Sequence, residues 1–346
     1  MNIYTDEGWL DVPLLVRQGM PFIFITGARG TGKTYGSFSY CIEENIKFIF
    51  MRRTMGEIEV LWANELLNPF KDYNADHGTN IGIIKKTKYT GVIVEREADQ
   101  NGKLVQKGPI LGLAVALSTF ANLRGFSGSD YDLLFYDEFI PERHVRPIKD
   151  EHMAFMNVYE TINRNRELLG RKPLQCICAS NSNRLDNDMY MGLGLVAKVD
   201  RMKREGQLVS IMPKRGIMLV NMERSPISEQ KRNTALYRMS AGTGFDRMAL
   251  NNEYIGEEET GTIKSVPIKE YTPIASIGEI TIYRHKSKHC YYVTTHKSGS
   301  PPTFGIGDSE RARFRKSFGW LWREYIDDFC IFESRICEIL LTKYFD

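Results

Sequence analysis

The stretch Gly27-Ala28-Arg29-Gly30-Thr31-Gly32-Lys33-Thr34 decides the fold expected for this chain. It fits the pattern G-x-x-x-x-G-K-[ST], a loop whose backbone N–H groups surround the phosphates of a nucleotide. Residues 21–26 form a largely apolar run typical of a buried parallel strand, and residues 35–44 predict a helix. Because the N-terminus of that helix would point at the phosphates, the sequence predicts a nucleoside-triphosphate site.

The residue types in this loop each have a physical role. Glycines let the backbone turn tightly and come close to an anion. Lys33 would reach the β- and γ-phosphates, and the Thr34 hydroxyl would bind Mg²⁺. We therefore expect ATP and Mg²⁺ as cofactors, with residues 27–34 and the adjoining Tyr35 in contact with the nucleotide.

A second nucleotide motif is predicted at residues 131–138. In Tyr-Asp-Leu-Leu-Phe-Tyr-Asp137-Glu138, apolar and aromatic residues precede two acids. A buried strand ending at Asp137 would let its carboxylate hold the Mg²⁺ ion through water. Glu138 would be the general base that polarises the attacking water. This arrangement is typical of ATPases of the additional-strand, catalytic-glutamate class and separates them from P-loop kinases and GTPases.

Asn181 follows a third strand-like run, residues 174–179. Ligands bind at the carboxyl edge of such sheets, so its side chain could bind the attacking water or the γ-phosphate. The alternative is an Asn that only begins a loop. Strand-like runs alternate with helical ones up to this point, which predicts an α/β fold with a mainly parallel sheet between helices.

The ordered set of motifs resembles the genome-packaging ATPases of small tailed bacteriophages of the phi29-like type. No single motif is specific to that family, whereas their order is. One departure is the uncharged pair Thr54-Met55, where relatives carry a basic residue, so a nucleotide-exchange role is not carried over. The resemblance rests on Gly27–Lys33, Arg52-Arg53, Asp137–Ile140, Arg164–Glu167, Cys176–Asn181 and, more weakly, Met248–Gly256.

The resemblance implies a ring-shaped, homopentameric motor that drives double-stranded DNA into a preformed procapsid at its portal, or connector. The residue matching Arg164 is an arginine finger that enters the neighbouring subunit's site, worth roughly 10³–10⁵ in rate. Arg166, two residues on, points elsewhere in a helix and is the lesser candidate. The implied location is the host cytoplasm and, transiently, the portal vertex, with absence from the mature virion. The use of a packaging RNA stays open.

Length and composition favour about two domains and a connector. No apolar run approaches the ~18 residues of a membrane span, and the first residues lack signal-peptide character. The six cysteines are scattered, as in intracellular proteins with reduced thiols. We expect a P-loop ATPase domain at 1–197, a small basic, helical linker domain at 198–245 and a C-terminal domain at 246–346.

Two groups of basic residues are candidates for nucleic-acid contact. Period-two alternation over 80–117 predicts an antiparallel insertion with a turn at Asn101-Gly102. Residues 198–238 hold ten Lys or Arg against four acids, and such a local excess suits DNA phosphates. In both places a solvated surface is the alternative interpretation. The candidates are Lys85, Lys86, Lys88, Lys203 and Arg204.

The C-terminal domain is expected to be α+β, because period-two runs within 262–295 precede helical spacing over 312–345. In the larger packaging enzymes this position is a ribonuclease-H-like nuclease, whose two metals need clustered carboxylates. Here the candidate first strands offer only Glu279. We therefore expect a degenerate, non-cleaving version of that domain.

The sequence thus predicts an ATP-driven translocase that packages double-stranded viral DNA. Two alternatives stay open: a terminase-type enzyme with a working C-terminal nuclease, and an ATP-regulated DNA-binding assembly factor whose hydrolysis is incidental. Steep stimulation of the ATPase by double-stranded DNA would separate the motor from the assembly factor.

Overall fold

The computed structural model describes residues 1–123, 125–142, 145–182, 184–222, 225–243 and 261–345. The chain divides into two units, of which the first combines Met1–Asn183 with Gly206–Glu253 and the second combines Arg184–Glu205 with Tyr254–Asp346. A nine-stranded sheet organises the first unit and a six-stranded sheet the second.

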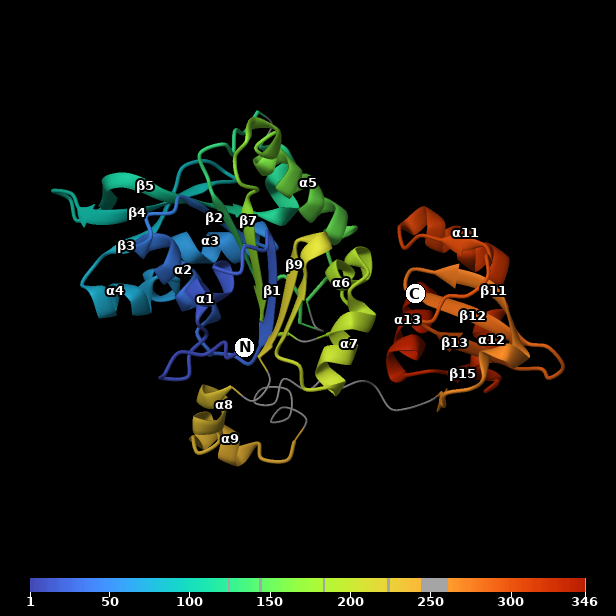
Figure 1. Ribbon diagram of the computed structural model, residues 1–346. Helices are drawn as coiled ribbons and strands as arrows, with labels where there is room; N and C mark the ends of the chain where they lie inside the picture. Colours follow the sequence, from blue (N-terminus) through green and yellow to red (C-terminus); the bar gives the residue numbers. More distant parts are fainter. Residues whose placement is uncertain (124, 143–144, 183, 223–224, 244–260, 346) are drawn as a thin grey trace. The chain divides into compact units, whose positions relative to one another are not determined.

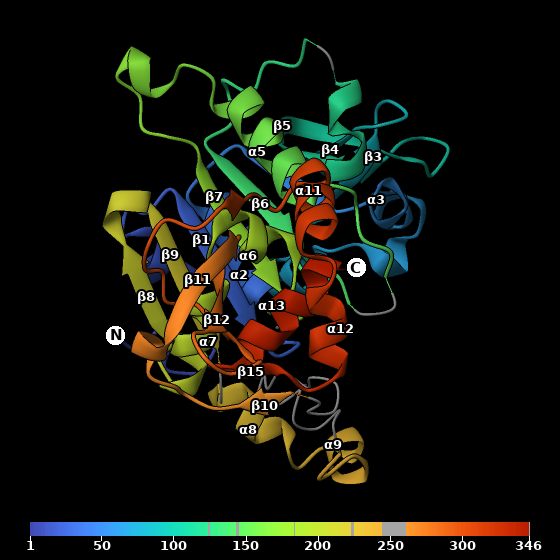
Figure 2. The same cartoon turned by 90° about the vertical axis from the view of Figure 1, so that its right-hand side faces the viewer.

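The larger sheet has the strand order β3-β4-β5-β2-β6-β7-β1-β9-β8 (Figure 1). The six central strands, from β5 to β9 in that order, are parallel, and antiparallel strands close both edges. Figure 2 shows the edge strands β3 and β8 on opposite sides of this sheet. The strands are β1 (Phe22–Gly27), β2 (Phe48–Arg52), β3 (Ile81–Lys85), β4 (Gly91–Ala98), β5 (Leu104–Ala116), β6 (Leu133–Asp137), β7 (Gln175–Ser180), β8 (Val209–Met212) and β9 (Ile217–Met222).

Helices cover both faces of the central strands, which explains why those strands read as continuous apolar runs. Successive side chains of a strand point to opposite faces. Phe135 of β6 packs on Phe38 of α2, with ring centroids 5.4 Å apart, and Tyr136 stacks on Phe155 of α5 at 5.8 Å. The helices of this unit are α1 (Val12–Val16), α2 (Lys33–Glu43), α3 (Met55–Ala63), α4 (Lys71–His77), α5 (Glu151–Asn163), α8 (Pro226–Lys231) and α9 (Ala235–Met239).

A buried ion pair fixes α5 against the sheet. Arg53, just after β2, donates from Nε and Nη2 to the two carboxylate oxygens of Glu151, over 2.7 and 2.9 Å. The hydroxyl of Tyr136 donates to the same carboxylate over 2.8 Å. Because a buried charge is stable only when it is paired and hydrogen-bonded, this triad ties the first turn of α5 to β2 and β6. Arg53 is therefore a structural residue.

The strand register brings the carboxyl ends of the central strands to one edge. Thr26 of β1 lies opposite Ser180 of β7, and Gly27 lies opposite Met222 of β9. Asp137, the last residue of β6, lies opposite Ala179. The loops after β1, β6 and β7 therefore begin side by side, as ligand-binding loops do in such sheets.

The α/β fold with a mainly parallel sheet between helices is confirmed, and the insertion over 80–117 is antiparallel as expected. Its turn is held by Asp99, whose carboxylate accepts from the N–H groups of Asn101 and Lys103 over 2.8 and 2.9 Å. The insertion is not a separate layer, because β5 continues into a parallel pairing with β2.

The prediction of a helical linker over 198–245 is wrong for its middle part. Residues 209–222 form β8 and β9, which extend the large sheet beyond β1. The division into two units also differs from the boundaries predicted at 197 and 245. The physical reason is that β9 is buried along its whole length, which places it in the core. The weaker motif at Met248–Gly256 lies outside the described residues.

The second unit has the strand order β10-β15-β13-β12-β11-β14, in which β11, β12 and β13 form an antiparallel meander. The expected order of strands and then helices is found, except that β15 interrupts the helical region over 312–345. Its elements are α6 (Asp188–Leu193), α7 (Val196–Arg204), β10 (Thr262–Ile263), β11 (Tyr271–Ile277), β12 (Ile280–His285), β13 (Tyr291–Thr294), β14 (Thr303–Phe304), α11 (Asp308–Phe318), α12 (Leu321–Ile326), β15 (Cys330–Phe332) and α13 (Arg335–Phe345).

Glu279 lies in the turn between β11 and β12, and its carboxylate binds the start of α7. It accepts from the backbone N–H groups of Val196 and Ala197 over 2.8 and 3.1 Å. The first N–H groups of a helix have no partner within the helix, so this carboxylate satisfies two of them. The contact explains why α7 belongs to the second unit. Among the described residues, no helix is both long and apolar enough to cross a bilayer.

Candidate active site

The glycine-rich loop between β1 and α2 has the backbone that its sequence requires. Gly30 and Gly32 have φ of +62° and +92°, in the left-handed region that other residues rarely adopt. A Cβ on Gly27 would lie 2.6 Å from Cβ of Met222 on β9. Gly32 precedes α2 without a side-chain cap, so the first N–H groups of α2 are available to an anion.

Lys33 lies inside this loop and is almost completely buried. Its ammonium donates to the carbonyls of Gly27 and Ala28 over 2.9 and 2.7 Å. Burial lowers the pKa of Lys33 from the usual 10.5 to about 8, although the nearby carboxylates of Glu138 and Asp137 act in the opposite direction. An ammonium held by neutral carbonyls in a buried place is well prepared to bind phosphate oxygens.

Asp137 and Thr34 supply the oxygen atoms of the expected magnesium site. The Thr34 hydroxyl lies 3.4 Å from Oδ1 of Asp137, to which it donates. Hydroxyl and carboxylate oxygens are the ligands that Mg²⁺ prefers, so the pair fits this ion. Burial raises the pKa of Asp137, and the positive charges of Arg52 and Lys33 oppose that rise.

Arg52 is a site residue to which sequence reasoning gave no role. Its guanidinium, at the end of β2, lies 2.9 Å from Oδ2 of Asp137. The Nε atom of Arg52 is buried without a hydrogen-bond acceptor. Arg52 thus supplies positive charge to the buried carboxylate. Its position beside Asp137 depends on the pairing of β2 with β6, which no local sequence pattern reveals.

Glu138 has a strained backbone and a carboxylate held by Asn181. Its φ is +57°, which is unusual for a residue with a side chain. The carboxylate accepts from the backbone N–H of Asn181 over 3.2 Å and from the side-chain amide of Asn181. Burial raises the pKa of Glu138, and the charge of Asp137 raises it further. Strain at this position points to a functional constraint on the carboxylate.

Two further residues of the predicted nucleotide-binding run, Arg29 and Tyr35, also have contacts. Arg29 is exposed and forms an ion pair with Glu142. Tyr35 donates from its hydroxyl to Asp76 of α4 over 2.8 Å. The N-terminal segment supports the loop from outside, since the N–H of Leu10 donates to the carbonyl of Thr31 over 3.1 Å.

Arg164 does not lie with these residues. It follows the last residue of α5 with φ of +44°, and its exposed guanidinium donates to the carbonyls of Thr161 and Phe126. The end of α5 adjoins the beginning of β7, because the Asn163 amide oxygen accepts from the N–H of Leu174 over 2.8 Å. Arg164 therefore lies at the amino edge of the sheet, about five strand residues or ~16 Å from the edge that holds Asp137. It cannot serve the nucleotide site of its own chain.

Arg166 has a structural role that its sequence neighbourhood did not reveal. Its buried guanidinium donates to the carbonyls of Tyr131 and Lys172 and forms an ion pair with Asp132. These contacts join the loop after α5 to the start of β6. Arg166 is thus unavailable to a neighbouring subunit.

The basic residues proposed for nucleic-acid contact fall in different units. Lys85 and Lys88 place their ammonium groups over the rings of Trp62 and Tyr89, at 5.6 and 5.3 Å from the ring centroids. Lys86 donates to Gln106 over 3.4 Å. These three are exposed near the tip of the β3–β4 hairpin.

The second basic group belongs to α7. Lys203 is half-buried, and the exposed Arg204 donates to Asp200 over 2.9 Å. Because α7 is part of the second unit and the β3–β4 hairpin is part of the first, the two basic groups belong to different units.

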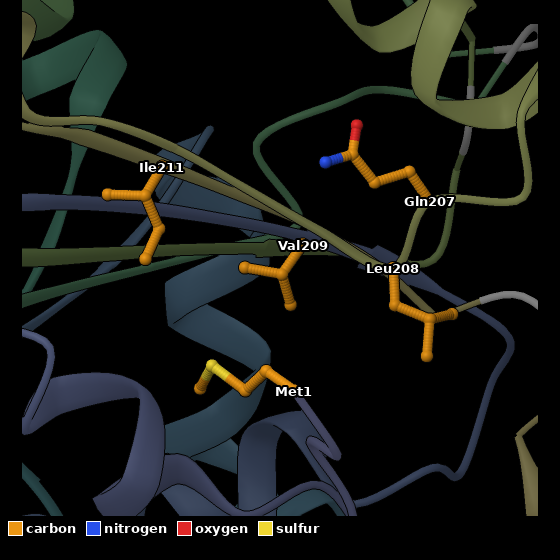
Figure 3. A pocket seen from close by; sticks show the side chains of 5 residues that line it. All are labelled: Met1, Gln207, Leu208, Val209 and Ile211. Atoms are coloured by element: carbon orange, nitrogen blue, oxygen red, sulfur yellow. The ribbon is translucent and has the colours of Figure 1, made fainter.

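A cavity of about 520 Å³ lies beside the edge strand β8 (Figure 3). It is lined by Met1, Gln207, Leu208, Val209 and Ile211. These side chains are apolar apart from one amide, and none carries a charge. The cavity therefore does not suit a polyphosphate and is separate from the candidate active site.

The pKa of Lys33 makes a testable prediction for any triphosphate bound here. The ammonium is needed to bind phosphate, and phosphate charge would raise its pKa in the complex. ATP binding should therefore take up a proton above pH 8, and affinity should fall by up to about tenfold per pH unit there. Below pH 7 Lys33 should contribute neither to proton uptake nor to the pH dependence of ATP affinity, because it is then charged in both the free and the bound protein.

Calorimetric titration with ATP in two buffers of different ionisation enthalpy would measure this proton uptake at pH 7 and pH 9. Lys33→Arg is the matched control, since a guanidinium stays charged throughout. Equal proton uptake by the unchanged protein at both pH values would contradict the prediction.

Comparison with known proteins places the chain among viral proteins. Residues 14–272 match the family model described as Podovirus DNA encapsidation protein (Gp16). The DNA packaging protein of Bacillus phage phi29 is 26% identical over 245 residues, which cover 68% of this chain and 63% of that protein. The DNA packaging protein of Bacillus phage B103 is 26% identical over 243 residues, which cover 68% of this chain and 65% of that protein. The chain thus spans somewhat less than two thirds of the length of these relatives.

Two solved structures share the fold over nearly the whole chain. One is described as the bacteriophage Phi-29 viral genome packaging motor assembly, with a TM-score of 0.62, 19% identity and coverage of 99% of this chain and 100% of that chain. The other is the Phi-28 gp11 DNA packaging motor, with a TM-score of 0.60, 19% identity and coverage of 99% and 97%. The resemblance inferred from the ordered motifs is confirmed by the family match. Since that match covers well over half of the 346 residues, the chain belongs to the Podovirus DNA encapsidation protein (Gp16) family.

Proposed function

We propose that this chain is an ATP-driven translocase that packages double-stranded viral DNA into a procapsid. The observation that carries the proposal is the meeting of Lys33, Thr34, Asp137, Glu138 and Asn181 at one edge of the sheet. Membership of the DNA encapsidation family supports DNA packaging as the process that ATP hydrolysis would drive.

In this proposal Lys33 leaves the carbonyls of Gly27 and Ala28 and binds the β- and γ-phosphates of ATP. Thr34 and Asp137 would hold Mg²⁺, which when bound neutralises phosphate charge. Glu138 accepts the proton of the attacking water as general base. Asn181 orients the Glu138 carboxylate through the two hydrogen bonds that it donates.

Hydrolysis is completed between subunits. Arg164 lies at the sheet edge opposite its own nucleotide site, is exposed and forms no ion pair with any residue that the structure describes, so it suits a neighbour's γ-phosphate. A ring of identical subunits, which we propose to be a pentamer, brings each Arg164 to the next site. Hydrolysis would then depend on assembly of the ring. We propose that the subunits are located in the host cytoplasm and that the ring assembles transiently at the procapsid portal.

DNA contact is proposed for the two basic groups, Lys85, Lys86 and Lys88 in the first unit and Lys203 and Arg204 in the second. Lysine and arginine side chains near the surface release counterions when they bind phosphates, so binding should weaken with salt. The use of a packaging RNA stays open.

The C-terminal unit is proposed to be a degenerate, non-cleaving nuclease-like domain used for docking. Its candidate carboxylate Glu279 binds the backbone of α7. Both oxygens are thereby engaged in a structural contact. Specific cleavage of DNA in the presence of Mn²⁺ would favour the terminase-type alternative.

The decisive measurement is ATP hydrolysis with and without double-stranded DNA, on protein assembled with procapsids. A translocase should show steep stimulation by long double-stranded DNA, because movement along DNA releases products that otherwise limit turnover. An assembly factor with incidental hydrolysis should show none. Hydrolysis that is not stimulated at any DNA concentration would therefore contradict the translocase and favour the assembly factor.

A further inference from the structure

Lys231, the last residue of α8, reaches the glycine-rich loop from a segment far along the chain. Its ammonium donates to the carbonyl of Arg29 over 2.5 Å and to the carbonyl of Gly30 over 3.0 Å. A Cβ on Gly30 would collide with that ammonium. The glycine at this position thus makes room for Lys231 as well as permitting the left-handed backbone of the loop.

The position of α8 beside the loop is fixed by packing. The hydroxyl of Ser225 accepts from the N–H of Ser228 over 3.1 Å at the start of the helix. Ile227 is buried, and a Cβ on Gly8 would lie 2.7 Å from Cβ of Pro226. Lys231 therefore extends from an anchored helix, so that its side chain reaches the loop from a defined place.

The electrostatics of this contact favour an anion. The partners that the structure gives the Lys231 ammonium are two neutral carbonyls. Partial burial lowers the pKa of Lys231, and the charge of Lys231 in turn contributes to lowering the pKa of Lys33. Two ammonium groups and the uncapped N-terminus of α2 thus lie around one short loop. Polyphosphate would relieve the repulsion between them.

We propose that Lys231 is a further nucleotide-positioning residue, which exchanges its carbonyl partners for phosphate oxygens and so couples the α8–α9 segment to the bound nucleotide. The proposal rests on the proposed function, since it requires that the loop bind ATP. It assigns to α8 a task that none of the predicted motifs covers. The segment after β9 would respond directly to the presence of polyphosphate.

The test uses two substitutions of Lys231 and one control. Lys231→Gln keeps an N–H donor for the carbonyls of Arg29 and Gly30 and removes the charge, whereas Lys231→Arg keeps the charge. Lys214→Met removes an exposed lysine of the same unit. Lys214 lies just before the start of β9, at the end of the sheet opposite the glycine-rich loop. Equilibrium binding of ATP, ADP and AMP to the full chain is measured with Mg²⁺ present, and thermal unfolding is measured without nucleotide.

Loss of one charge-assisted phosphate contact should weaken ATP binding by Lys231→Gln roughly tenfold. AMP binding should change much less, Lys231→Arg should retain most of the ATP affinity, and thermal unfolding without nucleotide should match that of the control. ATP affinity of Lys231→Gln equal to that of Lys214→Met would overturn the proposal. So would an equal loss for ATP, ADP and AMP, because that pattern indicates damage to the loop. If the unchanged protein binds no ATP, the proposed function itself fails.

Discussion

Replacing Glu138 by Gln should leave ATP binding intact and reduce the turnover number roughly 10²- to 10⁴-fold, as expected for the loss of a general base. The amide has nearly the shape of the carboxylate and can still meet Asn181, so the site should keep its structure. It cannot accept a proton from water. The measurement is steady-state ATP hydrolysis together with equilibrium ATP binding on the same preparation.

Glu44→Gln is the matched control, because Glu44 is an exposed carboxylate just after α2. It should hydrolyse ATP at the unchanged rate. Near-normal hydrolysis by Glu138→Gln would show that Glu138 is not the general base. Its strained backbone would then have no functional explanation.

Replacing Arg164 by Ala should reduce hydrolysis by roughly 10³- to 10⁵-fold, the usual effect of removing an arginine finger. In free energy of activation this is on the order of 4–7 kcal/mol. Folding should be little affected, because the guanidinium is exposed and its hydrogen bonds to described residues go to the carbonyls of Thr161 and Phe126. ATP binding should also persist, since the proposed nucleotide site lies at the opposite edge of the sheet.

Mixed rings separate a role between subunits from a role within one. Subunits with Arg164→Ala keep Glu138, and subunits with Glu138→Gln keep Arg164, so some interfaces of a mixture regain both groups. Hydrolysis should therefore reappear on mixing the two inactive variants, in proportion to the number of such interfaces. A mixture as inactive as either parent would show that the assignment between subunits is wrong.

Arg171→Ala serves as the control for this experiment. Arg171 is a second exposed arginine near the same end of the sheet, where it donates to the carbonyl of Ser129 over 2.9 Å. Its loss should leave hydrolysis unchanged, because the finger requires a guanidinium in one position. Equal loss from Arg171→Ala and Arg164→Ala would indicate a general effect of surface charge.

The sequence alone predicted the glycine-rich loop, the strand that ends at Asp137 and the strand that precedes Asn181. Each is a local pattern: glycines where the backbone has positive φ, and apolar runs where a parallel strand is covered on both faces. The family resemblance depended on the order of these local patterns. Their meeting at one edge could be expected, because parallel strands of one sheet end on the same side.

The middle of the predicted linker was misjudged for a physical reason. The stretch 198–238 stands out by its excess of basic over acidic residues, but composition does not show which apolar residues are buried. Ile217–Met222 is buried along its whole length as β9, beside β1. Pairing with a strand far away in the sequence decided its structure, and local charge did not.

The sequence by itself predicted which residues would bind phosphate, hold Mg²⁺ and activate water, because those roles depend on side-chain types in local strand, loop and helix contexts. Only the tertiary structure decided their partners. It placed Arg52 on Asp137, Lys231 on the loop of Lys33, and Arg164 at the far edge of the sheet. These placements follow from strand order and helix packing, which join residues distant in the chain and leave no trace in local spacing.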